Sequence, residues 1–212
     1  MKNILFILSS IVSFSSFGQT AQEYIYSGNE KAKTNDYYGA ISDYTKAIEL
    51  NAVSTTAYYN RGNSKDNLKD YYGAISDYTK AIELNPNDHG AYYNRGNSKD
   101  NLKDYYGAIS DYTKAIELNP NDANPPLIAI QYTKAGGYYN RGNSKYELKD
   151  YYGAISDYTK AIELYANYGK AYKNRSIAKK NLGDLNGACK DWEKAAELGD
   201  TDTAEWVANQ CN

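Results

Sequence analysis

The chain is poor in the residues that most catalytic and metal sites need, with one His and two Cys in 212 residues. The single His89 makes neither a catalytic triad nor a histidine metal site, and two Cys are too few for a four-thiolate zinc site. No glycine-rich phosphate loop is present. The 24 Lys and Arg nearly balance the 26 Asp and Glu, which favours neither a nucleic-acid binder nor an acidic tail. We therefore expect no enzyme, no cofactor and no metal.

Long apolar runs are missing after residue 18, which predicts a chain without a membrane span beyond that point. Residues 1–18 differ, because Lys2 precedes about eleven apolar residues at 4–14 and small residues follow at 16 and 18. This segment is too short to cross a bilayer and is typical of a secretory signal cleaved after Gly18. We expect export to the periplasm or the exterior of a bacterial cell of the Gram-negative type; the alternative is an uncleaved anchor.

What the chain does have is tyrosine, 25 residues against 3 Phe and 2 Trp, arranged in an internal repeat. The string YYGAISDYTKAIEL starts at Tyr37, Tyr71, Tyr105 and Tyr151, and a weaker copy starts at Leu185. The spacing is 34 residues, except for one step of 46, which is 34 plus 12. A fixed period of this size indicates a repeat architecture rather than a single globule.

Each copy predicts two helices. From Tyr71 the apolar residues recur at i, i+3, i+4, i+7, i+10 and i+11, the pattern of an amphipathic helix. Asp70 stands at its N-cap and Pro86 follows its end. A first helix is expected over 57–68, where Gly62 allows a neighbouring helix to approach closely. One such hairpin cannot bury its apolar face alone, whereas stacked hairpins can.

This pattern resembles the tetratricopeptide repeat. The family's characteristic positions fall on Tyr58, Gly62, Ala74, Tyr78, Ala81 and Pro86. The resemblance implies an all-α, right-handed α-solenoid of five helix-turn-helix repeats at 21–54, 55–88, 89–122, 135–168 and 169–202. Departures are visible, since Arg replaces the family's Leu before the Gly, and Lys replaces its Tyr three residues after the Gly in the three middle repeats.

The Arg residues suggest ion pairs between repeats, because an unpaired Arg near a core edge is costly. Repeat one has Ser27 in this place, as expected if each Arg pairs with an Asp of the repeat before it. The expected pairs are Asp43–Arg61, Asp77–Arg95, Asp111–Arg141 and Asp157–Arg175. The alternative is that each Arg extends its head group into solvent.

Two further segments interrupt or end the array. Residues 123–134 form a 12-residue insertion, either a passive loop or a hinge between three and two repeats. Residues 203–212 are expected to make a C-terminal capping helix with Trp206 and Val207 against the last hairpin. Cys189 and Cys211 lie at similar distances on either side of the preceding turn, so we expect a disulfide between them; the alternative is two buried free thiols.

In the family, the first helices of successive repeats line a concave groove, so the resemblance places binding residues there. The polar face of these helices repeats Tyr and Asn, and it turns basic in the last repeat. The predicted groove residues are Tyr59, Asn60, Asn63, Asp66, Tyr93, Asn94, Asn97, Asp100, Tyr139, Asn140, Asn143, Tyr146, Lys173 and Asn174.

Asn side chains both donate and accept hydrogen bonds, which suits an extended peptide backbone, and Tyr is favoured at interfaces. We therefore expect a non-catalytic scaffold that binds a partner protein or peptide segment, and no nucleic acid. The alternatives are a solenoid that binds elsewhere or serves a purely structural role, and a glycan-binding protein, because Tyr beside Asn also suits sugars.

Overall fold

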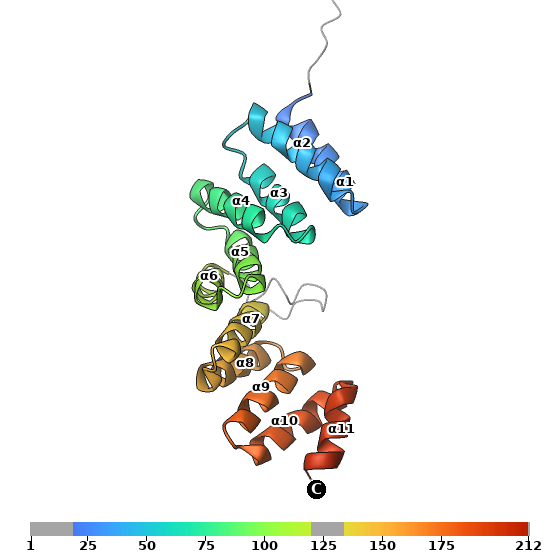
Figure 1. Ribbon diagram of the computed structural model, residues 1–212, viewed down its shortest axis with the longest axis vertical. Coiled ribbons are helices and arrows are strands. Elements are labelled where there is room, and N and C mark those ends of the chain that lie inside the picture. Colours follow the sequence, from blue (N-terminus) through green and yellow to red (C-terminus); the bar gives the residue numbers. More distant parts are fainter. Residues whose placement is uncertain (1–18, 120–133, 212) are drawn as a thin grey trace, which may run out of the picture.

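The computed structural model describes residues 19–119 and 134–211, which form eleven α-helices and no strand (Figure 1). The helices are α1 (Ala21–Lys33), α2 (Tyr37–Leu50), α3 (Thr55–Asn67), α4 (Tyr71–Leu84), α5 (His89–Asn101), α6 (Tyr105–Leu118), α7 (Lys134–Glu147), α8 (Tyr151–Leu164), α9 (Gly169–Asn181), α10 (Leu185–Glu197) and α11 (Thr201–Gln210). The predicted signal at 1–18 lies outside the described residues, as does the predicted insertion except for Lys134, the first residue of α7.

The helices pack as five successive hairpins, from α1 with α2 to α9 with α10, and each hairpin packs on the next. Figure 1 shows the hairpins following one another along the longest axis, with α11 at the far end. The predicted all-α solenoid of five helical hairpins and a C-terminal helix is thereby confirmed. No helix in the described ranges has the length and apolar character that a bilayer crossing requires.

The second helix of each hairpin starts in the same way. Asp70 is the N-cap of α4, as predicted, and its side chain accepts a hydrogen bond from the backbone N–H of Gly73 at 3.0 Å. A Cβ on Gly73 would lie 2.1 Å from an Asp70 oxygen, so a larger residue here would require the Asp70 side chain to shift. Lys69, just before, adopts the left-handed region with φ of 62° and turns the chain between the helices. These residues make the hairpin turn short and defined.

Small residues and one large aromatic ring fill the core of each hairpin. In the second repeat Tyr78 is buried, and its ring lies against Gly62, where an added Cβ would approach to 2.8 Å. Ala74 and Ala81 are fully buried on the same helix. Tyr44, Tyr112, Tyr158 and Trp192 occupy the equivalent place in the other hairpins and are also buried. The apolar face predicted for the helix that starts at Tyr71 therefore supplies the core of this hairpin.

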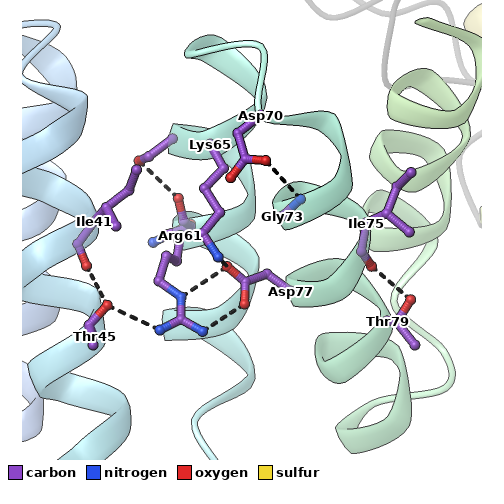
Figure 2. A network of polar contacts seen from close by, with 11 residues as sticks. Ile41, Thr45, Arg61, Lys65, Asp70, Gly73, Ile75, Asp77 and Thr79 are labelled. Carbon is purple, nitrogen blue, oxygen red and sulfur yellow. Dashed lines mark hydrogen bonds and ion pairs between the residues drawn. The ribbon is translucent and has the colours of Figure 1, made fainter. Parts of the chain in front are cut away.

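The predicted pairing of each Arg with the preceding repeat is wrong. Arg61 instead binds Asp77 of its own hairpin, through Nε at 2.9 Å and Nη2 at 2.7 Å (Figure 2). Lys65 Nζ reaches the same carboxylate at 2.7 Å. The preceding repeat supplies a neutral partner, because Nη1 of Arg61 donates to Thr45 Oγ1 at 3.1 Å. Arg95, Arg141 and Arg175 make the same contacts with Asp111, Asp157 and Asp191.

The physical reason is the geometry of the hairpin, which places Arg and the Asp sixteen residues later at one level on facing helices. The first repeat follows the same logic with other residues. Ser27 donates to Asp43 at 2.6 Å and Lys31 pairs with it at 2.6 Å. Burial raises the pKa of Asp43, but the hydrogen bonds from Lys31 and Ser27 outweigh it and hold the pKa below its ordinary value. Asp43 therefore needs no Arg from the next repeat.

The C-terminal helix begins at Thr201, two residues before the expected start, because Asp200 caps it through the N–H of Thr203. It packs on α10 as each first helix packs on the second helix before it. Trp206 contacts Trp192 with ring centroids 5.6 Å apart. A disulfide joins Cys189 of α10 to Cys211, directly after α11.

Candidate functional site

Two surface pockets open on the first helices of the hairpins. One pocket, of about 480 Å³, lies between the first two repeats and includes Asn29, Asn60 and Asn63 in its wall. The other, of about 400 Å³, spans the third to fifth repeats and includes Asn143 and Asn174, with Asp100, Tyr146 and Glu147. Six of the predicted groove residues thus line a pocket shared with a neighbouring repeat.

The predicted asparagines form a ladder that runs from repeat to repeat. Asn63 Oδ1 accepts a hydrogen bond from the Tyr78 hydroxyl at 2.8 Å and another from Asn94 Nδ2 at 2.9 Å. The same pair of bonds recurs at Asn29, with Tyr44 and Asn60, at Asn97, with Tyr112 and Asn140, and at Asn143, with Tyr158 and Asn174. The ladder therefore joins each repeat to the next.

The predicted tyrosines of the first helices take part in the same ladder. The hydroxyl of Tyr59 accepts from Asn94 Nδ2 at 3.0 Å, that of Tyr93 from Asn140 at 2.7 Å, and that of Tyr139 from Asn174 at 3.1 Å. Tyr93 is only 6% exposed. These rings face the next repeat rather than standing free in solvent, which the helical wheel of a single helix could not reveal.

The ladder leaves one kind of polar atom available on each asparagine. An amide oxygen has two lone pairs, so the oxygens of Asn29 and Asn143 are saturated by the two bonds that they accept. Their Nδ2 groups are the donors that remain on these side chains, and the Asn143 side chain also lies within reach of the Tyr139 hydroxyl. Asn60 and Asn174 use their nitrogens in the ladder, which leaves their amide oxygens as the acceptors on these side chains. Each pocket thus combines a donor and an acceptor of fixed orientation.

The predicted carboxylates are also shared between repeats. Ser98 donates its hydroxyl to Asp66, and Ser144 donates to Asp100 in the same way. Burial raises the pKa of both carboxyl groups, and the serine hydroxyl only partly offsets this effect. The serines were not among the predicted residues, although their recurrence at the repeat period was a usable signal.

The last repeat carries a different set of contacts. Lys173 Nζ lies 2.7 Å from Asp202 and 3.1 Å from Asp200, both at the start of α11. The hydrogen bond with Asp202 contributes most to raising the pKa of Lys173 above its ordinary value. Tyr146, in α7, packs on Tyr151 and accepts a hydrogen bond from Asn181 at 3.0 Å.

Within residues 19–119 and 134–211, no cluster of three His, Cys, Asp or Glu residues has the arrangement of a metal site.

Comparison with known proteins places this arrangement in context. Family models of the tetratricopeptide repeat match residues 55–88, 90–122 and 135–168. A crystal structure of MamA protein is 24% identical with a TM-score of 0.74, and the alignment covers 84% of this chain and 91% of that one. MamA from Desulfovibrio magneticus RS-1, residue 41 to its end, is 19% identical with a TM-score of 0.74, covering 85% and 96%.

A third similar structure is YrrB, described as a TPR protein with an unusual peptide-binding site. It is 22% identical with a TM-score of 0.73, and the alignment covers 89% of this chain and 92% of that one. At these identities the likeness is one of fold. A search of curated proteins by sequence returns no significant match.

Proposed function

This chain is a tetratricopeptide-repeat protein, and we propose that it serves as a scaffold that holds an extended segment of a partner protein along its first helices. Proteins built from these repeats are generally non-catalytic and bind protein or peptide partners. The similar fold of YrrB, which is described as having a peptide-binding site, supports the same class of partner.

The observation that carries the proposal is the orientation of the asparagine ladder. A peptide group offers one N–H and one C=O, and each pocket presents a donor, from Asn29 or Asn143, beside an acceptor, from Asn60 or Asn174. Because the ladder fixes these amides before a ligand arrives, binding loses little side-chain entropy. An extended segment is favoured, since its unpaired backbone groups are the ones that such amides recognise.

The test exchanges one atom in each pocket. Asn29→Asp with Asn143→Asp keeps the oxygen that serves the ladder and replaces the donating nitrogen by an accepting oxygen. The matched control is Asn87→Asp with Asn167→Asp, which makes the same charge change at two exposed turn residues. Peptides are selected on the wild-type protein from a displayed random library, and their affinities for all three proteins are measured by fluorescence anisotropy.

We expect the pocket variant to bind the selected peptides at least tenfold more weakly and the control variant to bind them like the wild type. Equal affinity for all three proteins would contradict the proposal. Binding confined to sugars on a glycan array, with no peptide selected, would favour the glycan alternative instead.

We also propose that the protein is exported, on the basis of the signal-like residues 1–18. Mass spectrometry of protein from periplasmic and culture fractions tests this. A chain that begins at Gln19 is the expected result, and an intact chain confined to the cytoplasm would contradict it.

A further inference from the structure

Helix α9 has a charge unlike that of the other first helices. It contains Lys170, Lys173, Arg175, Lys179 and Lys180 and no acidic residue. Every other first helix contains at least one Asp or Glu. Within α9, Arg175 and Lys179 both pair with the buried Asp191 of their own hairpin. The remaining cations need partners from elsewhere.

Those partners come from the end of the chain. Lys173 Nζ contacts Asp202 at 2.7 Å and Asp200 at 3.1 Å, and it lies 5.3 Å from the ring centroid of Trp206. Lys180 Nζ bonds the side-chain oxygen of Gln210 at 2.7 Å. Both ends of α11 therefore hold a cation of α9, while the α9 residue Asn174 lines the neighbouring pocket.

Helix α11 is short and most of its residues are exposed. It has ten residues, of which only Thr203 is buried, and Trp206 is half-buried against Trp192. The covalent attachment is the disulfide from Cys211, directly after the helix, to Cys189 in α10. The disulfide thus fastens the end of a short helix that packs on α10 and pairs with lysines of α9.

We propose that α11 is a disulfide-held latch over a basic binding surface on α9, and that this surface takes an acidic segment of a partner protein when the latch is released. In the closed form Asp200 and Asp202 supply the carboxylates that the partner would bring. Release requires a dithiol reductant. Its thiolate attacks one sulfur, two electrons and two protons convert Cys189 and Cys211 to thiols, and the reductant leaves as its own disulfide.

Charge complementarity selects the acidic partner. In the closed form, the carboxylates of Asp200 and Asp202 pair with Lys173. With α11 detached, α9 would present Lys170, Lys173 and Lys180 with no acidic residue on the same helix. An acidic segment would restore the missing carboxylates. The inference is separable from the proposed function, because release of α11 is measured without any partner and the probe peptide need not use the asparagine ladder.

The two Trp of the chain, Trp192 and Trp206, both lie at this latch and report on it directly. The experiment compares the oxidised wild type, the wild type treated with a dithiol, and the variant Cys189→Ser with Cys211→Ser. Tryptophan emission and hydrogen exchange of α11 measure release. Anisotropy of a fluorescein-labelled, Glu-rich ten-residue peptide measures binding, with inorganic polyphosphate as a second polyanion and circular dichroism as the check of folding.

Reduction and the double Ser variant are expected to shift the emission to longer wavelength, to remove protection from α11 and to tighten peptide binding at least tenfold. Adding Lys173→Gln and Lys180→Gln should abolish the gain. A second route keeps the disulfide: Asp202→Asn should tighten binding about threefold, whereas the exposed Glu205→Gln on the same helix should not.

Unchanged emission and protection after reduction would overturn the proposal. So would release of α11 without tighter peptide binding, a gain that survives the loss of both lysines, or an equal gain for polyphosphate, which would indicate a general polyanion surface rather than a site for a protein segment.

Discussion

Asp77 at the centre of the repeated ion network offers the most direct test of how the hairpins hold together (Figure 2). Its side chain is 4% exposed and receives Arg61 Nη2 and Lys65 Nζ, each at 2.7 Å. Asp77→Asn preserves the shape and removes the charge, so two cations at 16% and 20% exposure lose their counter-ion. Removing one partner of a buried ion pair costs about 3–5 kcal/mol.

We expect the lower end of that range, about 3 kcal/mol, because the Asn oxygen still accepts one hydrogen bond and both cations keep some contact with water. In a chain of this size each kcal/mol lowers Tm by about 2–4 °C, which gives a fall of about 6–12 °C. Thermal unfolding followed by circular dichroism at 222 nm measures it. Because repeat arrays open in segments, hydrogen exchange should locate the loss in α3 and α4.

The control is Glu83→Gln, which removes the partner of Lys80 in an exposed pair on the same helix as Asp77. Exposed pairs of this kind add little stability, so we expect no measurable change in Tm. An unchanged Tm for Asp77→Asn, or a fall no larger than that of Glu83→Gln, would show that the buried carboxylate does not stabilise the hairpin.

Two further predictions concern packing and pH. Gly62→Ala should destabilise the chain by about 1–3 kcal/mol, because the added Cβ would press on the Tyr78 ring. Gly169→Ala, whose Cβ would make an ordinary 3.4 Å contact, should stabilise the chain by about 0.4–1 kcal/mol. Urea unfolding measures both variants, and equal stability of the two would contradict this prediction. Burial raises the pKa of Asp66 in the folded chain above its ordinary value of 3.8. At a pH above the folded pKa the buried carboxylate is ionised and lowers the free energy of unfolding. This loss disappears as the pH falls below 3.8, because the carboxyl group is then protonated in both the folded and the unfolded chain. Asp66→Asn should therefore stabilise the chain at pH 7 and not at pH 3, with the exposed Glu193→Gln as control, and a gain of equal size at both pH values would exclude the burial effect.

The repeat made most of the fold predictable. A 34-residue period with Gly62 facing a large aromatic ring requires paired helices, and Asp70 marks where the second helix starts. The pairing of Arg61 was not predictable in the same way, because Asp43 and Asp77 lie at similar sequence distances on either side. Only the packing of the hairpin decides which carboxylate lies level with the guanidinium.

The candidate site, too, was predictable from the sequence only in part. Residue type and period located the polar face of the first helices, including Asn63, Asn97 and Asn143. They could not show that Tyr78 and the next asparagine saturate the amide oxygen of Asn63. That outcome depends on contacts between residues thirty-one positions apart, which no single helix contains.

By itself, the sequence determined that this is a stack of helical hairpins, because only stacking buries an apolar face that recurs every 34 residues. The tertiary structure alone decided which polar atoms remain available, because hydrogen bonds between neighbouring repeats consume one side of each asparagine. It also brought the carboxylates of the last helix to the lysines of α9. The period of the sequence therefore sets which helices recur, whereas contacts between neighbouring repeats set which polar groups can still bind a partner.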